Sequence, residues 1–350
     1  MKLTSLIALM LSLFSNIALA HERWVEHDLM NPIDESMFSL SDATFQSLLL
    51  RTLSFAIAIV GVWVLRQRIA FTIETHLPKL KNVSNFVFKS RGIFNLKISK
   101  TIEDAALRLP ALVLIYSAAG GYLIMPSFPV APEYMNMARF AQALLAVMIV
   151  ADICLPLVGL GIFGVIGIIF AEYGAAAIDV LPVAGVAYLY VTTKVRHHHF
   201  LLKAQQIRVT RVIIGTSFFA LGIMKILRPE IIVGVVDHYN GVMHDPMILP
   251  FWLGTDLEHS RECWAIGFAC SEMLVGGLIA LGIFSRALSL IGAFVFAKLM
   301  LSSFGWLEFP HIFPISCLLL VALHPSRRQK DVLQKVVVTI PEPSKARKVA

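Results

Sequence analysis

Four ionisable side chains lie within stretches of sequence that are otherwise apolar. Lys225 stands near the end of one apolar run, Glu272 lies within the next, and Lys298 and His311 belong to the last two. A charged side chain is costly in hydrocarbon, so such residues usually face the interior of a helical bundle or a watery cavity. These four positions are therefore the first candidates for chemistry.

Two interpretations fit Glu272. In the first, Glu272 and Lys225 are catalytic, because a buried carboxyl group can exchange the protons of redox chemistry. Lys298, His311 and Arg211 would then bind the substrate, either an anion such as a sulfur oxyanion or the headgroup of a quinone. In the second interpretation, Glu272 pairs with Lys225 or Lys298 and only holds the helices together. The sequence leaves both open.

Histidines suggest a different chemistry at the segments expected outside the membrane. His21, His27 and His244 are candidate metal ligands, and Met243 precedes His244. Accessible histidine combined with methionine is typical of copper sites. However, these histidines are scattered and lack the i, i+4 spacing of a helical metal site. The histidine run at 197–199 falls in a basic connection and is interpreted as a solvated, charge-supplementing segment.

Composition indicates an integral membrane protein. The 350 residues are 57% hydrophobic and only 15% charged, whereas a soluble domain carries about 25% charged residues. The net charge of +7 does not indicate a nucleic-acid partner, because the basic residues gather in loops and in the tail, where they orient a protein in the lipid bilayer. The four cysteines form no CxxC or zinc pattern and are expected to be buried free thiols.

The chain begins with the pattern of a signal peptide at residues 1–20, although an uncleaved first helix is the alternative. A short exported segment follows at 21–44, a first span at 45–65 and a basic loop at 66–108, in which the runs near 72–90 and 98–108 are interpreted as interfacial helices along the membrane surface. Eight further spans are predicted at about 109–125, 138–155, 157–172, 177–193, 209–228, 262–282, 285–303 and 310–324.

Charge asymmetry predicts the orientation of these spans. The loop at 66–108, the connection at 194–208 and the tail at 325–350 are basic, which places them in the cytoplasm. The long loop at 229–261 contains acidic residues and is expected on the outer face, as a lid or as a connector. The sequence thus predicts an all-α, polytopic transmembrane helical bundle of about nine mature spans in a bacterial inner membrane, with a periplasmic N-terminus and a cytoplasmic C-terminus.

The spans after the first divide into two sets of four, at 109–193 and 194–324. Gly161-Ile162-Phe163 in the first set resembles Gly282-Ile283-Phe284 in the second. Both sets enter the membrane from the same side, so the predicted units are parallel tandem repeats. Chance similarity between apolar segments is the alternative.

The second set resembles the DoxX family of small bacterial and archaeal membrane proteins. The matching features are a basic entry at Arg208 and Arg211, Gly215, the Gly222 to Lys225 helix end, Glu272 followed by Gly276 and Gly277, and a turn at Arg286. These cover about a third of the chain. The first set keeps the four-span layout but has Asp152 and Asp179 in place of the membrane glutamate.

The resemblance implies a quinone-linked redox role, in which the protein would be a subunit of a respiratory or sulfur-oxidising complex. The sequence has no haem, flavin or iron–sulfur motif of its own. The alternatives are a non-enzymatic membrane protein that binds or passes a small ligand or copper at the outer face, and a structural partner in a larger complex.

Overall fold

The computed structural model describes residues 42–88, 96–126, 128–196, 199–227, 261–298, 300 and 309–324. The predicted signal peptide, the exported segment up to residue 41, the outer loop from 228 to 260 and the basic tail lie outside the described residues. Within the described part, the chain is helical apart from one short hairpin, which agrees with the predicted all-α class.

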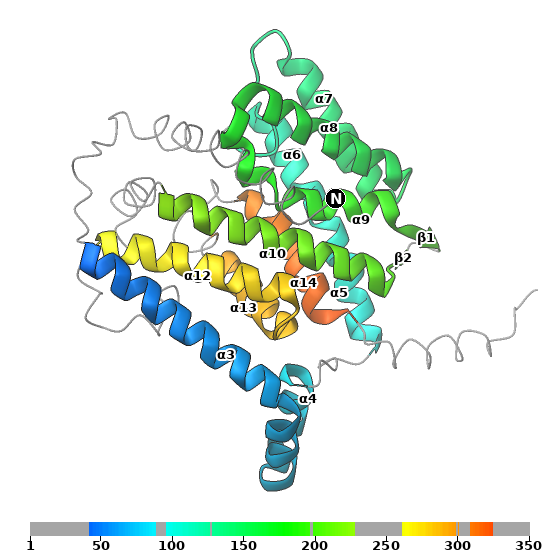
Figure 1. Ribbon diagram of the computed structural model, residues 1–350. Coiled ribbons are helices and arrows are strands. Elements are labelled where there is room, and N and C mark those ends of the chain that lie inside the picture. The colour runs from blue at the N-terminus through cyan, green and yellow to red at the C-terminus, as the bar shows by residue number, and fades with distance from the viewer. Residues whose placement is uncertain are drawn as a thin grey trace, which may run out of the picture.

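The first helix of the described residues is α3, which runs from Asp42 to His76 and is longer than the predicted span at 45–65. Residues 66–76, predicted to begin the cytoplasmic loop, continue this helix because neither proline nor glycine interrupts them before Pro78. Arg66 is a favourable helix residue, and its guanidinium lies over the Trp63 ring at 3.9 Å. Figure 1 shows α3 beside α12 at the edge of the bundle.

The rest of the predicted loop is also largely helical. A short 3-10 helix, η2 (Pro78–Leu80), leads into α4 (Lys81–Val87), and α5 runs from Leu96 to Arg108. Helix α5 continues almost directly into α6 (Pro110–Gly120), because Leu109 between them keeps right-handed helical dihedrals. Pro110 fits at the first position of α6, where a backbone N–H is not needed.

The first predicted set of spans corresponds to α6, α7 (Met135–Val150), α8 (Leu155–Tyr173), the 3-10 helix η3 (Gly174–Val180) and α9 (Val183–Thr192). The 11 residues of α6 extend over only about 16 Å, about half the thickness of a bilayer core. Together with α5, however, they form a rod comparable in length to α10, the first helix of the second set.

A two-stranded antiparallel hairpin separates the two sets. Strand β1 (Lys194–Arg196) pairs with β2 (His199–Leu201), and Val195 lies opposite Phe200. The sequence pattern predicted only a basic connection at 194–208. The Phe200 side chain is fully buried, which fixes the hairpin against the bundle.

The second set contains α10 (Ala204–Leu227), α12 (Arg261–Leu281), α13 (Ser285–Lys298) and α14 (Ile312–Leu323), with a 3-10 turn at 309–311 before α14. A helix of the described residues lies at each predicted span, but only three of these helices are long and apolar enough to cross a membrane.

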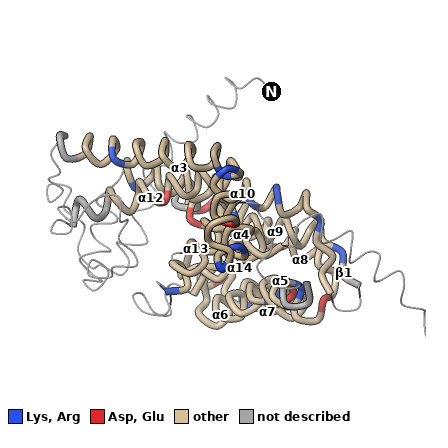
Figure 2. The backbone as a smooth tube through the Cα atoms, turned by 90° about the horizontal axis from the view of Figure 1, so that it is seen from below, with Lys and Arg blue, Asp and Glu red and all other residues tan. Residues whose placement is uncertain are grey.

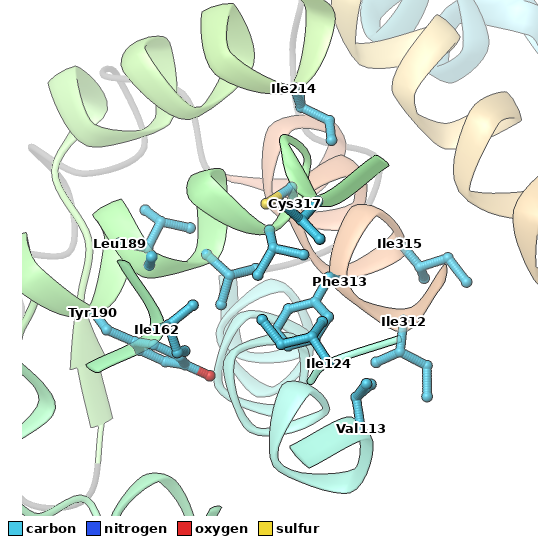
Figure 3. Packing of buried hydrophobic residues seen from close by; sticks show 14 of the residues in the cluster. Val113, Ile124, Ile162, Leu189, Tyr190, Ile214, Ile312, Phe313, Ile315 and Cys317 are labelled. Atoms are coloured by element: carbon cyan, nitrogen blue, oxygen red, sulfur yellow. The ribbon is translucent and has the colours of Figure 1, made fainter. Parts of the chain in front are cut away.

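One continuous core joins the two sets. Figure 3 shows Val113 and Ile124 from the first set packed near Ile312 and Phe313 of α14. The hydroxyl of Tyr190 in α9 is also buried and donates a hydrogen bond to the Leu107 carbonyl at 2.5 Å. This shared core means that the sets are not independently folded domains.

The outer surface is strongly apolar. Among the described residues, three helices are long and apolar enough to cross a membrane, spanning Phe45–His76, Leu155–Tyr173 and Ala204–Leu227. Large side chains such as Phe140 and Leu281 are more than 70% exposed, and Figure 2 shows few charged positions along most of the helices. An apolar surface of this extent fits lipid and indicates association with a membrane.

Candidate functional site

The structure brings two of the predicted site residues together. Lys225 Nζ in the last turn of α10 donates a hydrogen bond to Glu272 Oε2 in α12, across 2.7 Å. The two side chains are 16% and 10% exposed, so the ion pair is largely shielded. The Phe268 ring lies 4.9 Å from the lysine nitrogen and covers the pair on one side.

Glycines determine how closely α10 and α12 approach. A Cβ atom added to Gly222, one turn before Lys225, would lie 2.5 Å from the Met273 nitrogen and 2.7 Å from the Ala269 carbonyl oxygen. Gly215 and Gly276 make equally short backbone contacts farther along the same interface. Side chains on two such closely packed helices reach one another easily, which places the lysine and the glutamate within bonding distance.

Helix α3 lies against the same part of the molecule. Leu48 of α3 packs with Ile266 and Cys270 of α12 and with Ile226 of α10. Thr52, also on α3, is buried and donates a hydrogen bond to the Leu48 carbonyl at 2.9 Å. The ion pair therefore lies near a contact between α3, α10 and α12 that is mostly apolar among the described residues.

Lys298 and His311 do not join the pair. Within the described residues, neither of them forms a hydrogen bond or ion pair with Lys225 or Glu272, although each has other interactions. The His311 ring lies 4.9 Å from the Phe296 ring, and Phe296 stacks on Phe218 at 5.1 Å. Of the residues predicted to form an outer pocket around one carboxylate, Lys225 is therefore the cation that contacts Glu272.

Arg211 lies at the opposite end of α10 from Lys225. The 14 intervening residue steps correspond to about 21 Å along the helix axis. Its guanidinium instead covers the turn between α12 and α13, where a Cβ on Gly282 would lie 2.5 Å from Arg211 Nη1. Arg211 therefore cannot bind the same small substrate as the ion pair.

The candidate metal ligands His21, His27 and His244 lie outside the described residues. Among the residues that the structure does describe, no group of three or more His, Cys, Asp or Glu side chains is arranged to hold a metal ion. The prediction of buried free thiols is confirmed for Cys270 and Cys317 but is wrong for Cys154, whose free thiol is exposed.

The structure reveals a polar network that sequence reasoning missed. Glu103 and Asp104 of α5 are only 3% and 6% exposed. His324 Nδ1, just after α14, lies 2.6 Å from Glu103 Oε1, and His199 Nδ1 of the hairpin lies 2.7 Å from Asp104 Oδ2. Lys100 Nζ approaches both carboxylates, at 3.5 and 3.1 Å.

This network corrects the interpretation of His199 as part of a solvated run. Its side chain is 61% exposed, but it binds a buried carboxylate and helps hold the hairpin on α5. The Phe200 backbone N–H also donates to Asp104 Oδ1 at 3.0 Å. In the sequence, Leu107 follows Glu103 and Asp104 at helical spacing, which indicates that the two acids share a buried helix face. Their histidine partners are distant in sequence, so no local pattern predicted the contacts.

Corresponding turns connect the second and third helices of the two sets. In the first set, Asp152 and Cys154 have φ of 58° and 47°; in the second, Gly282 and Phe284 have φ of 82° and 47°. The Ile153 N–H donates to the Met148 carbonyl at 2.9 Å, and the Ile283 N–H donates to Leu278 in the same way, also at 2.9 Å. The matching segments are therefore 152–154 and 282–284. The sequence match to Gly161 is wrong, because Gly161 lies inside α8.

No family model, curated protein or solved structure matches this chain.

Proposed function

We propose that this protein is a DoxX-like integral membrane protein that supports quinone-linked redox chemistry, with Lys225 and Glu272 at the reacting site. The observation that supports the proposal is the shielded 2.7 Å contact between these side chains in a mostly apolar helix interface. A pair that only holds the helices together would make the same contact, and the turnover of the variants described below separates the two interpretations. Ionisable groups inside membrane bundles are costly, and they commonly mark proton or ligand pathways.

The pair is suited to the proton exchange that accompanies quinone chemistry. Reducing a quinone takes up protons with the electrons, and oxidising a quinol releases them. Glu272 would accept or donate the proton next to the headgroup, and Lys225 would stabilise the carboxylate when it is charged. The electrons would pass to or from a redox partner subunit, which accords with a role inside a respiratory or sulfur-oxidising complex.

We further propose nine mature spans in a bacterial inner membrane, two tandem four-helix units, a periplasmic N-terminus and a cytoplasmic C-terminus. Contacts between distant segments support this topology. Asp104 binds His199 and Glu103 binds His324, and all four residues belong to the predicted inner face. On the predicted outer face, the Tyr173 hydroxyl donates to the Pro129 carbonyl at 2.6 Å. The matching turns support the tandem units.

Quinone binding and reduction test the role of the ion pair. We expect a short-chain quinone analogue to quench the tryptophan fluorescence of the purified protein. In membranes that contain the partner subunits, Glu272→Gln and Lys225→Met should each lower quinone turnover about 100-fold or more. Ser271→Ala is the matched control, since Ser271 neighbours Glu272 in α12 but donates its hydrogen bond to the Gly267 carbonyl. Wild-type turnover in both pair variants would remove the pair from the mechanism.

Cysteine labelling tests the orientation separately. In a Cys263→Ser background, a maleimide that cannot cross membranes should label the exposed Cys154 only after the inner face is opened to the reagent, because the turn at 152–154 is predicted to be cytoplasmic. Cys270 and Cys317 are buried and should stay unlabelled. Labelling of Cys154 in intact cells would invert the proposed topology.

A further inference from the structure

The two corresponding turns differ in one feature of their charge. At the first turn, Asp152 faces Arg108, the last residue of α5. Arg108 Nη2 lies 2.9 and 2.7 Å from the two carboxylate oxygens of Asp152, so the turn supplies the counter-ion of the arginine. In the second set, Arg211 reaches the turn in a similar way, but Gly282 occupies the position of Asp152. The carboxylate is therefore missing from the place where the second arginine reaches the chain.

Nothing described in the protein replaces that carboxylate. Across the described ranges, no acidic side chain lies within ion-pair distance of Arg211, and its Nε is buried without a hydrogen-bond partner. Arg208, one helical turn earlier on α10, adds a second positive charge and supplies no counter-ion. A guanidinium in partly apolar surroundings is costly when it has no anionic partner.

The surroundings of Arg211 fit a phosphate headgroup. The turn at 282–284 is packed from the other side by Phe88, whose ring lies 5.9 Å from the Phe284 ring. Arg211 stands two turns inside α10, so its long side chain lies near the predicted inner surface of the bilayer. Arginine binds phosphate oxygens through paired N–H groups, and basic residues at this depth commonly hold anionic lipids.

We propose that Arg211 and the α12–α13 turn form a binding site for a phosphate-type oxyanion, supplied by the headgroup of an anionic phospholipid in the inner leaflet. The external phosphate takes the place that the Asp152 carboxylate occupies at the first turn. This site is separate from the Lys225–Glu272 pair, so it does not depend on the proposed redox function.

The test uses the purified full-length protein in a neutral detergent, with thermal unfolding measured as phosphatidylglycerol is added. Phosphatidylcholine and inorganic phosphate are the comparison ligands. We expect phosphatidylglycerol to raise the Tm of the wild type by about 4 °C near saturation. Arg211→Gln should abolish this shift, whereas Arg208→Gln, a change of the same type one turn away, should retain most of it.

Gly282 provides a second pair of variants. Gly282→Asp places a carboxylate beside Arg211, as in the first set, and should remove the lipid response. Gly282→Asn has the same shape and the same backbone strain at positive φ but no charge, so it should keep the response. These variants decide the question if Arg211→Gln fails to fold, and circular dichroism checks the helix content of each.

Equal Tm shifts in the wild type and Arg211→Gln, or in Gly282→Asp and Gly282→Asn, would overturn the proposal. A shift of the wild type by phosphatidylcholine equal to that by phosphatidylglycerol would overturn it too, because both lipids carry a phosphate but only one is anionic. An equal shift by inorganic phosphate alone would support the oxyanion site and overturn its assignment to lipid.

Discussion

The two four-helix sets place their closest helix contacts at different positions. In the first set, a Cβ on Gly159 of α8 would lie 2.6 Å from the Ala187 carbonyl oxygen, so the third and fourth helices are in backbone contact. In the second set, Gly215 and Gly276 bring the first and second helices together. Only the second arrangement places a lysine and a glutamate opposite each other. Similar helix layouts can thus hold different chemistry, depending on where glycines allow helices to touch.

The largest expected loss of stability comes from adding a methyl group at the glycine contact between α10 and α12 in the second set. In Gly215→Ala, the new methyl group would lie 2.5 Å from the Ala280 nitrogen and 2.7 Å from the Gly276 carbonyl oxygen. Backbone atoms cannot move aside easily, so we expect a loss of about 3 kcal/mol in the free energy of unfolding. Denaturant unfolding of the purified protein measures it.

Two further glycines sharpen this comparison. Gly159→Ala should be similarly costly, since the corresponding contact in the first set is also with backbone. Gly164→Ala, in the same helix as Gly159, meets nothing within 4 Å and should leave stability unchanged or slightly raised. A Gly164 variant as unstable as the other two would show that contact with the neighbouring backbone does not set the effect, because alanine has a higher helix propensity than glycine.

The next largest effect concerns the ion pair that distinguishes the second set. Glu272→Gln or Lys225→Met alone should cost about 2 kcal/mol, because each leaves a shielded charge without its partner. The double variant Lys225→Met with Glu272→Met should lose less than the sum of the two single changes, since no isolated charge remains. A double-mutant cycle by thermal unfolding measures the coupling, and strict additivity would show that the pair contributes nothing.

A smaller effect is expected when the first turn is made to resemble the second. Asp152→Asn keeps a residue that tolerates positive φ and removes only the charge facing Arg108. We expect a loss of about 1 kcal/mol, corresponding to about 2 °C in Tm, because Arg108 is 29% exposed and partly screened. If phosphatidylglycerol restores more stability to this variant than to the wild type, the comparison between the two turns is strengthened.

The smallest effect should come from the edge of the α5 network. His199→Ala removes one contact to Asp104, but Lys100 and the Phe200 N–H still satisfy that carboxylate. We expect a loss of about 0.5 kcal/mol or less, because the His199 side chain is 61% exposed. A loss several times larger would mean that the hairpin depends on this histidine to stay on α5.

The helical layout was predictable from the sequence in considerable detail. Apolar runs as long as those at 157–172 and 209–228 predict helices in or near a membrane. Helices α8 and α10 lie at these positions. The pairing of Lys225 with Glu272 was one of two open interpretations, and its contact is observed. These features depend on local composition and on the high cost of leaving a charge alone in apolar surroundings.

Other features required the tertiary structure. Glu103 and Asp104 looked like acids of a surface loop, yet their partners His324 and His199 lie 221 and 95 residues away in the chain. The similarity between the backbone turns at Asp152 and Gly282 was hidden because the residue types differ, and it is seen only in their positive φ angles. Sequence determined where helices form, because that depends on nearby residues. Which side chains meet was decided by how closely the helices pack, and this depends on contacts that no local pattern records.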